Sequence, residues 1–347
     1  MIFDDLYLDG IAAVVPDFVT VADAAARGLC DEELSTGTDW LSVAVAGDVS
    51  APDMAARAGR DALAMSHHDA ADIAVLMHAS AGHQGPDIWS PAHYVQRHTI
   101  GGYGPALEVR QGCSGMVAAL ELAGCYLTAA PDRGAALVTA ADNWAHPLMD
   151  RWRGTKWALF GDAASALVLS RRQGFARVVN VCASSLPDLE ELNRGGEALF
   201  PPGATIGHRV RLRERVEAFQ GDQAEMARLI GQAEAGLIRR TLDEAGLKPG
   251  DISRVTHQSA GRRSIVEHIL EPFDGDLRLG MWEFGRRLGH TGASDQVCGL
   301  YQLLAGREVH PGDHVMLLGT GVGMAFACAI VQVLDELPAT AAPIPLP

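Results

Sequence analysis

The chain has 347 residues, of which 48% are hydrophobic and 20% charged, and 28 Lys and Arg against 43 Asp and Glu give a formal net charge of −15. These values are typical of a globular enzyme and suit two domains, or one double domain with a large shared core. The acidic balance argues against nucleic acid as the main partner, because phosphate backbones are bound by clustered Lys and Arg.

Strand-like apolar runs alternate with segments of helical periodicity along the chain. The predicted strands are 73–77, 135–140, 165–169, 177–181, 315–318 and 325–333. The predicted helices are 54–65, 116–127, 226–245 and 297–304. Near-continuous apolar strands alternating with helices indicate an α/β fold whose sheets are covered on both faces.

An internal repeat divides the chain into two halves. The stretch DIAVLMHAS from Asp72 recurs as DISRVTHQS from Asp251, which places His78 opposite His257. Further along, the first half reads GCSG and the second reads GHTG, each followed by a predicted helix and strand. We therefore predict two duplicated halves, 1–172 and 173–347, and an insert at about 184–224 without a counterpart in the first half.

The repeat predicts where a site would form. If the halves pack about a pseudo-twofold axis, Cys113 and His290 lie at equivalent helix starts. Two helix N-termini then point into one cavity, where a cysteine and a histidine can work as a pair.

The cysteines do not form a metal-binding pattern. None of the six lies in a C-x-x-C pair or at a zinc-site spacing. The N-terminal MIFDDLYLDG is acidic where a signal peptide is basic. No apolar run approaches the roughly 20 residues that span a membrane. We expect a cytoplasmic protein without a metal or other cofactor.

Seven motifs in order carry a family resemblance. They are TDWL at Trp40, APDMAARAG, QGCSGMVAAL around Cys113, FGDAASALVL, THQSAGRR around His257, GHTGAS at 289–294 and GTGVG at 319–323. In this order they resemble the β-ketoacyl-acyl-carrier-protein synthase III branch of the thiolase superfamily. The resemblance implies a five-layered αβαβα fold, a homodimer, and an acyl group carried on Cys113 from a carrier-protein or coenzyme A thioester.

Two departures from the condensing enzymes stand out. His290 occupies the position of their Asn, and the HQAN-type motif has lost its last Asn in His257-Gln258-Ser259-Ala260. The signature GH-x-GASDQ, with His290 and Asp295, resembles the synthase III-like acyltransferases of antibiotic pathways. It implies acyl transfer to a hydroxyl or amine of a secondary-metabolite acceptor, without decarboxylation. The Arg-rich segment that follows the family Trp is missing, so the donor, carrier protein or coenzyme A, stays open.

Three residues form the predicted catalytic set. Cys113 precedes a helix, whose unpaired N–H groups favour a nucleophilic thiolate. His290 can take a proton from an acceptor near neutral pH, and Asp295 can orient it as in a Cys-His-Asp triad. That contact requires residues 290–293 to be non-helical. The alternatives are a core thiol for Cys113, a cavity filler for His290, and a helix-dipole partner for Asp295.

Four further positions are assigned by the resemblance. It implies that His257 assists the thiolate or the thioester carbonyl, and that Gly321 supplies an N–H to an oxyanion hole together with Cys113. It also implies that Trp40 and Arg262 lie at the mouth of the substrate tunnel, against a nucleotide and an acidic carrier protein. The alternatives are a satisfied core histidine for His257 and a solvated charge for Arg262.

Other functions remain open at this level. A decarboxylative synthase III would condense acyl-Cys113 with malonyl carrier protein. A non-catalytic partner of a synthase complex would keep the fold for its dimer surface. Thiolases and hydroxymethylglutaryl-type synthases share the fold, although the motif order fits synthase III better.

Overall fold

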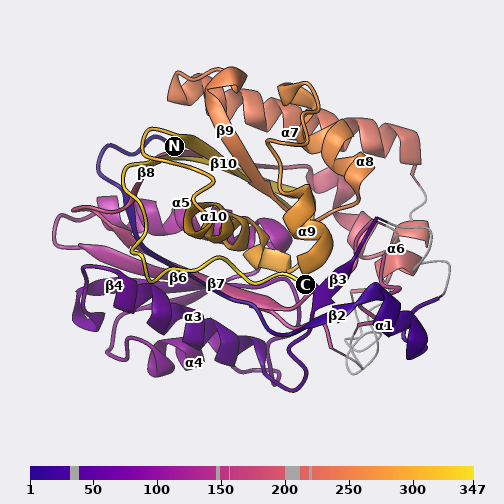
Figure 1. The fold of residues 1–347 in the computed structure, drawn as a ribbon, viewed down its shortest axis with the longest axis horizontal. Coiled ribbons are helices and arrows are strands. Elements are labelled where there is room, and N and C mark those ends of the chain that lie inside the picture. The colour runs from indigo at the N-terminus through magenta and orange to yellow at the C-terminus, as the bar shows by residue number, and fades with distance from the viewer. Residues whose placement is uncertain (32–38, 146–148, 156, 200–211, 219–220) are drawn as a thin grey trace.

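Helices α5 (Gly115–Thr128) and α10 (Asp295–Ala305) lie against each other at the centre of the molecule, between two layers of strands (Figure 1). Helices α3 (Ala51–Met65) and α4 (Pro91–His98) cover one outer face, and α7 (Gln223–Ala245) covers the other. The computed structural model describes the chain except residues 32–38, 146–148, 156, 200–211 and 219–220. This arrangement gives the five predicted layers.

Nine strands form one sheet in the described residues, in the order β5-β4-β6-β7-β1-β8-β11-β10-β9. They are β1 (Tyr7–Val14), β4 (Ile73–Ala79), β5 (Ala106–Val109), β6 (Ala135–Asp142), β7 (Ala163–Ser170), β8 (Ala176–Ser185), β9 (Ile252–His257), β10 (His314–Gly321) and β11 (Ala325–Val333). β1 and β8 pair only through Tyr7 with Arg177 and Leu8 with Ala176. The sheet is therefore two half-sheets joined at a short seam.

The two half-sheets repeat one pattern. In the first, β4 is parallel to β6, β6 antiparallel to β7, and β7 antiparallel to β1. In the second, β9 is parallel to β10, β10 antiparallel to β11, and β11 antiparallel to β8. This confirms the predicted α/β fold of two duplicated halves. The predicted boundary at 172/173 lies in the turn between β7 and β8.

The predicted alignment of the two halves is wrong at one point. A 3-10 turn, Gly112–Ser114, precedes α5, and the matching turn Gly292–Ser294 precedes α10. Each begins with a left-handed glycine, at φ 59° for Gly112 and 66° for Gly292. The structural equivalent of Cys113 is therefore Ala293, and His290 lies just before its turn rather than in it.

The remaining elements complete the cover of the sheet. They are the two-stranded sheet of β2 (Phe18–Thr20) and β3 (Ser42–Ala44), and the helices α1 (Val21–Ala26), α6 (Leu212–Ala218), α8 (Arg262–Ser264) and α9 (Trp282–Leu288). The predicted insert contains the end of β8, a 3-10 helix at Pro187–Asn193 and α6. Its segment 200–211 lies outside the described residues.

Local sequence accounts for the helix boundaries. Ser50 caps α3 by accepting the N–H of Asp53, and Asp222 caps α7 in the same way through Ala224 and Glu225. α7 ends at Gly246, which takes the left-handed conformation typical of a helix C-terminus.

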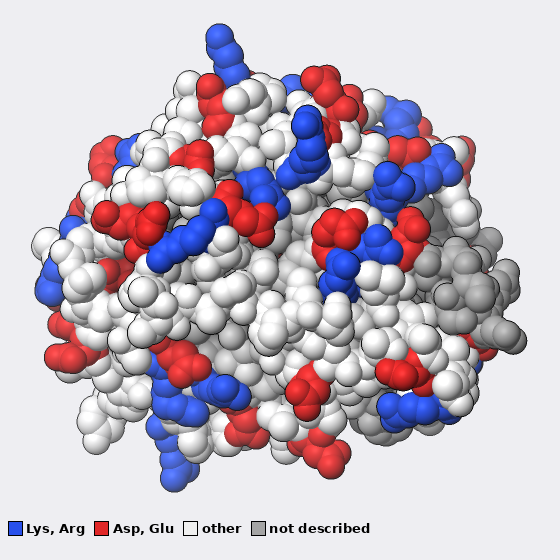
Figure 2. All heavy atoms as spheres, in the orientation of Figure 1, with Lys and Arg blue, Asp and Glu red and all other residues white. Residues whose placement is uncertain are grey.

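The described surface mixes charges of both signs. On the face in Figure 2, basic and acidic side chains are interspersed rather than gathered by sign. Within the described residues, no helix combines the length and apolarity that a membrane span requires.

A close backbone approach holds α3 on the sheet and can be tested. A Cβ on Gly10 of β1 would lie 2.1 Å from the carbonyl oxygen of Ala62 in α3, so Gly10→Ala must displace backbone. We expect it to lower the free energy of unfolding by about 1–3 kcal/mol in denaturant titration. Gly250→Ala is the matched control, because Gly250 is exposed and its Cβ would meet no atom within 4 Å. Equal unfolding free energies for the two variants would contradict this packing.

Candidate active site

Cys113 lies in the tight turn between β5 and α5. The left-handed Gly112 starts this turn, and a Cβ there would come within 2.6 Å of the Val322 nitrogen. Only glycine therefore allows the turn to pack this closely on the chain after β10. The Cys113 side chain is only 8% exposed.

His290 reaches Cys113 from the other half of the molecule. Its Nε2 lies 2.8 Å from the Cys113 Sγ. The backbone of His290 is held on both sides, because its N–H donates to Leu159 and its carbonyl accepts the N–H of Gly161. The imidazole is fully buried, with the rings of Trp157 and Phe160 at 5.2 and 5.3 Å between centroids.

Asp295 orients the imidazole. Its Oδ2 lies 2.5 Å from the His290 Nδ1 and accepts the N–H of Ser259 at 2.9 Å. Its Oδ1 accepts the N–H and the hydroxyl of Thr291 at 2.9 and 2.8 Å. The contact forms because α10 begins only at Asp295, after the 3-10 turn Gly292–Ser294 that leads from His290 into the helix. Residues 290–293 are outside the α-helix, although 292 and 293 lie in that 3-10 turn and are not fully non-helical as predicted. Cys113, His290 and Asp295 thus form one hydrogen-bonded row of side chains, the catalytic line.

The charges in this line reinforce one another. Burial alone lowers the pKa of His290, but the negative charge of Cys113 and then that of Asp295 outweigh it and raise the pKa well above its ordinary value. A protonated His290 therefore stabilises a Cys113 thiolate. By contrast, burial raises the pKa of Cys298, and raises that of Cys328 to about 12. These two stay neutral thiols.

The ring of His257 is bonded to backbone groups on both sides, and its catalytic role stays a prediction. Its Nδ1–H donates to the Gln258 carbonyl at 2.8 Å, and its Nε2 accepts the N–H of Met281 at 3.0 Å. Burial lowers the pKa of His257, which keeps the ring neutral. Both nitrogens are occupied by backbone, as expected of a satisfied core histidine. Its repeat mate His78 is likewise buried and bonded on both nitrogens.

Gly321 lies at the end of β10, against the Cys113 turn. A Cβ on Gly321 would lie 2.1 Å from the Gln111 carbonyl oxygen and 2.7 Å from the Ser114 Oγ. Glycine is required for this approach. The G-T-G-V-G segment is thus brought beside the nucleophile, as the resemblance implied.

Trp40 and Arg262 lie in different environments. Trp40 is only 9% exposed and packs edge-on against Trp282, at 5.8 Å between ring centroids. This ring is part of the core and has little surface left for stacking on a donor. Arg262 is exposed at the start of α8, next to Gly261, whose N–H donates to the Trp157 carbonyl. Arg262 thus follows directly on a residue that is bonded to Trp157, whose ring packs on His290.

Two residues near the site were not predicted from the sequence. Trp157 is 40% exposed beside His290 and can line the approach to it. Asp142 is fully buried at the end of β6 and accepts the N–H of Ala293. The internal repeat could have indicated Asp142, because Asp142 takes the position in the first half that Gly321 takes in the second.

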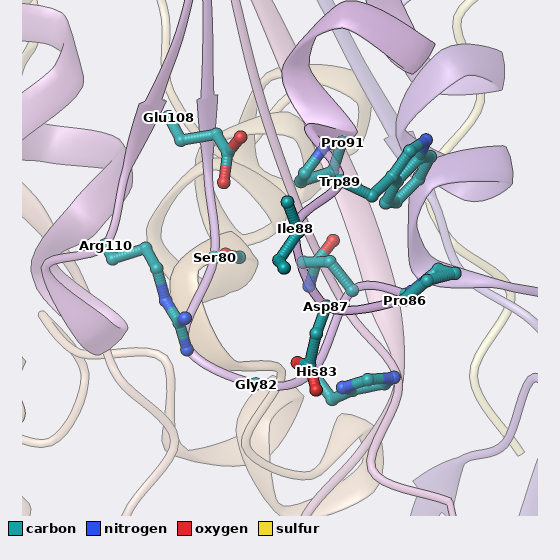
Figure 3. A pocket seen from close by; sticks show the side chains of 12 residues that line it. Ser80, Gly82, His83, Pro86, Asp87, Ile88, Trp89, Pro91, Glu108 and Arg110 are labelled. Atoms are coloured by element: carbon teal, nitrogen blue, oxygen red, sulfur yellow. The ribbon is translucent and has the colours of Figure 1, made fainter. Parts of the chain in front are cut away.

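A separate hollow lies beside the ends of β4 and β5. Figure 3 shows Glu108 and Arg110 on one side of it, and Asp87 and Ile88 on the other. It does not include the catalytic line. Among the described residues, no cluster of three or more His, Cys, Asp or Glu side chains could hold a metal ion.

Family comparisons agree with this geometry. The model of 3-oxoacyl-[acyl-carrier-protein (ACP)] synthase III matches residues 107–186, and that of its C-terminal part matches residues 242–333. Acetoacetyl CoA synthase NphT7 of Streptomyces sp. (strain CL190) is 31% identical over 345 residues, covering 93% of this chain and 97% of the relative. The β-ketoacyl-[acyl-carrier-protein] synthase III of Rhodospirillum centenum is 28% identical over 334 residues, covering 88% and 95%.

Solved structures show the same relationship. One described as the acyltransferase ChlB3 superposes with a TM-score of 0.90 at 40% identity, over 96% of this chain and 99% of that one. The 3-oxoacyl-[acyl-carrier-protein] synthase III of Aquifex aeolicus VF5 has a TM-score of 0.76 at 20% identity, over 94% and 99%, and shows the fold alone. The chain belongs to the 3-oxoacyl-[acyl-carrier-protein] synthase III family, and is an acyl-transferring enzyme with a thiolase-like fold.

Proposed function

We propose that this enzyme carries an acyl group on Cys113 and transfers it to a hydroxyl or amine of a small acceptor, without decarboxylation. The observation that carries the proposal is the buried line from Cys113 through His290 to Asp295. A histidine in contact with the nucleophile can act as a general base toward an acceptor, which an amide at that position cannot do.

The first step loads the enzyme. The Cys113 thiolate attacks the carbonyl carbon of an acyl thioester, and the bond from that carbon to the carrier sulfur breaks. The leaving thiolate takes the proton that His290 holds. The step ends with a neutral thioester on Cys113, a free carrier thiol and a neutral imidazole.

Loading itself converts His290 into a base. The charge of Cys113 comes first among the influences that raise the pKa of His290, and acylation removes that charge. The pKa then falls, while Asp295 continues to hold the ring. In the second step the neutral imidazole takes the acceptor proton, the acceptor oxygen or nitrogen bonds to the acyl carbon, and Cys113 leaves as a thiolate.

An oxyanion hole from the Cys113 and Gly321 N–H groups belongs to this proposal. Its support is the glycine-dependent packing of Gly321 on the Cys113 turn. One such donor contributes about 3 kcal/mol to stabilising a tetrahedral intermediate.

Decarboxylative condensation is the second candidate, favoured by the names of the curated relatives. It requires a group that holds the malonyl thioester oxygen, and the resemblance assigns that role to a histidine with an asparagine. Here the ring nitrogens of His257 are bonded to backbone, and His290 stands in the place of that asparagine. These features support the heteroatom transfer. The catalytic line also argues against a non-catalytic partner.

We propose a carrier protein or coenzyme A as donor, a secondary-metabolite acceptor, and a homodimer. The homodimer is supported by β5, which forms one edge of the sheet and leaves Leu107 45% exposed. Tyr103, just before β5, is fully exposed, and so is Ile88, which lines the hollow together with Glu108 of β5. An open edge strand with apolar neighbours is a surface on which a second copy can pair.

The cytoplasmic localisation stays a prediction. The structure shows all six cysteines as free thiols, and it contains no disulfide among them.

The paired charges predict a difference in Cys113 reactivity between the wild type and His290→Asn. Because the pKa of His290 is raised, its ring stays protonated beside the Cys113 sulfur until the pH rises through that raised value. At about pH 6.5 we expect iodoacetamide to alkylate Cys113 about tenfold or more faster in the wild type than in His290→Asn, because only the wild type holds an imidazolium against the sulfur. In His290→Asn the rate should fall at low pH and rise with pH. Identical profiles for the two proteins, followed by mass spectrometry, would remove the ion pair.

The two steps can be separated by substitution. Cys113→Ala should form no covalent adduct with a labelled acyl thioester. His290→Asn should still load Cys113, but transfer to an acceptor should slow by about 10²–10⁴-fold because the general base is missing. Single-turnover assays with a panel of acceptors measure both steps. His310→Asn, at an exposed turn, is the matched control. Unchanged transfer in His290→Asn would remove His290 from the mechanism.

A further inference from the structure

Asp142 joins the two halves of the molecule beside the active site. It is the last residue of β6 and is fully buried. Its Oδ1 accepts the N–H groups of Ala81 and Gly82, at 3.0 and 2.6 Å. Its Oδ2 accepts the N–H of Ala293, at 3.0 Å. Ala81 and Gly82 belong to the half that contains Cys113, and Ala293 belongs to the half that contains His290.

The duplication shows what this carboxylate replaces. β6 and β10 are equivalent strands, so Asp142 is the counterpart of Gly321. Ala293 is the counterpart of Cys113, because both follow the left-handed glycine of a 3-10 turn. In one half, Gly321 has no side chain, and its backbone packs directly on the Cys113 turn. In the other, the matching residue carries a side chain, and its carboxylate accepts the Ala293 N–H.

This carboxylate packs directly on the turn that follows His290. A Cβ on Gly292 would lie 2.1 Å from the Asp142 Oδ2, so the turn has no slack on that side. Asp295 holds the opposite side of the same turn through Thr291. The end of β6 contributes a further tie, since the Ser294 hydroxyl donates to the Ala140 carbonyl.

Burial makes the charged form of Asp142 energetically unfavourable at this position. It raises the pKa of the carboxyl to about 6, although the N–H donors and the nearby His290 oppose the rise. At neutral pH the group is mainly an anion, and the N–H donors only partly replace the water that it has lost. Its N–H donors come from the chain after β4 on one side and from the turn after His290 on the other.

We propose that Asp142 is a positioning residue for the Cys113–His290 contact. It binds the turn after His290 to the half that carries Cys113, and so sets the distance between Sγ and Nε2.

The test measures the alkylation rate of Cys113, which depends on how closely the His290 ring contacts the sulfur. The inference rests on the proposed ion pair, so alkylation of Cys113 is measured in the full-length wild-type protein, Asp142→Asn and His290→Asn. We expect Asp142→Asn to lower the alkylation rate at about pH 6.5 by 10–100-fold, the range typical of lost orienting partners. Acyl transfer from loaded enzyme should slow by a similar factor, while the extent of loading stays the same.

A matched control separates positioning from general loss of stability. Asp9→Asn alters another buried carboxylate that accepts a backbone N–H, from His67. It should leave the alkylation profile within about twofold of wild type. If Asp142→Asn does not fold, the smaller Asp142→Ser is measured in its place, with the same expected shift.

The outcomes are distinct. A shifted profile in both Asp142→Asn and His290→Asn supports the inference. A shift in His290→Asn with a wild-type profile and transfer rate in the Asp142 variant overturns the inference and leaves the proposed function standing. Wild-type profiles in both variants overturn the ion pair, and with it the proposed function.

Discussion

The contact between Cys113 and His290 is the constraint on which the site depends. The two side chains come from different halves and meet at 2.8 Å in a buried space. The duplicated fold brings the two turns together by placing α5 and α10 against each other between the half-sheets (Figure 1). In the proposed ion pair, a Cys113 thiolate and the His290 imidazolium stabilise each other where water is excluded.

Glycines at the strand ends and turns make that meeting possible. Gly112 and Gly321 bring the Cys113 turn and the end of β10 to distances that a Cβ would prevent, and Gly292 does the same beside Asp142. The two halves thus use one geometry for different purposes. Beside Cys113, the backbone of Gly321 packs directly on the turn. Beside Ala293, the carboxylate of Asp142 accepts the N–H of the matching turn. A duplicated chain in this way presents one reactive site rather than two.

Much of this arrangement could be predicted from the sequence. Apolar periodicity located β4, β6, β7, β8, β10 and the central helices, and β11 at its observed bounds, because regular burial imposes a regular pattern. The strands β1, β5 and β9 of the same sheet were not predicted. The motifs identified Cys113, His290 and Asp295. The repeat was misaligned because GCSG and GHTG share two glycines, whereas the left-handed glycines Gly112 and Gly292 define the true register. The surroundings of His257 and Trp40 were not predictable. Their partners, the Met281 backbone and the Trp282 ring, are distant in sequence.

In the proposed function, acyl-Cys113 reacts with a heteroatom acceptor and does not undergo decarboxylative condensation. The most direct measurement loads the enzyme from a panel of acyl thioesters and then adds malonyl carrier protein, while intact-protein mass spectrometry follows the adduct. The account predicts an adduct on Cys113 that persists, with no carbon dioxide release and no β-ketoacyl product. Consumption of the adduct with carbon dioxide release would contradict it and show that a condensing enzyme tolerates His290.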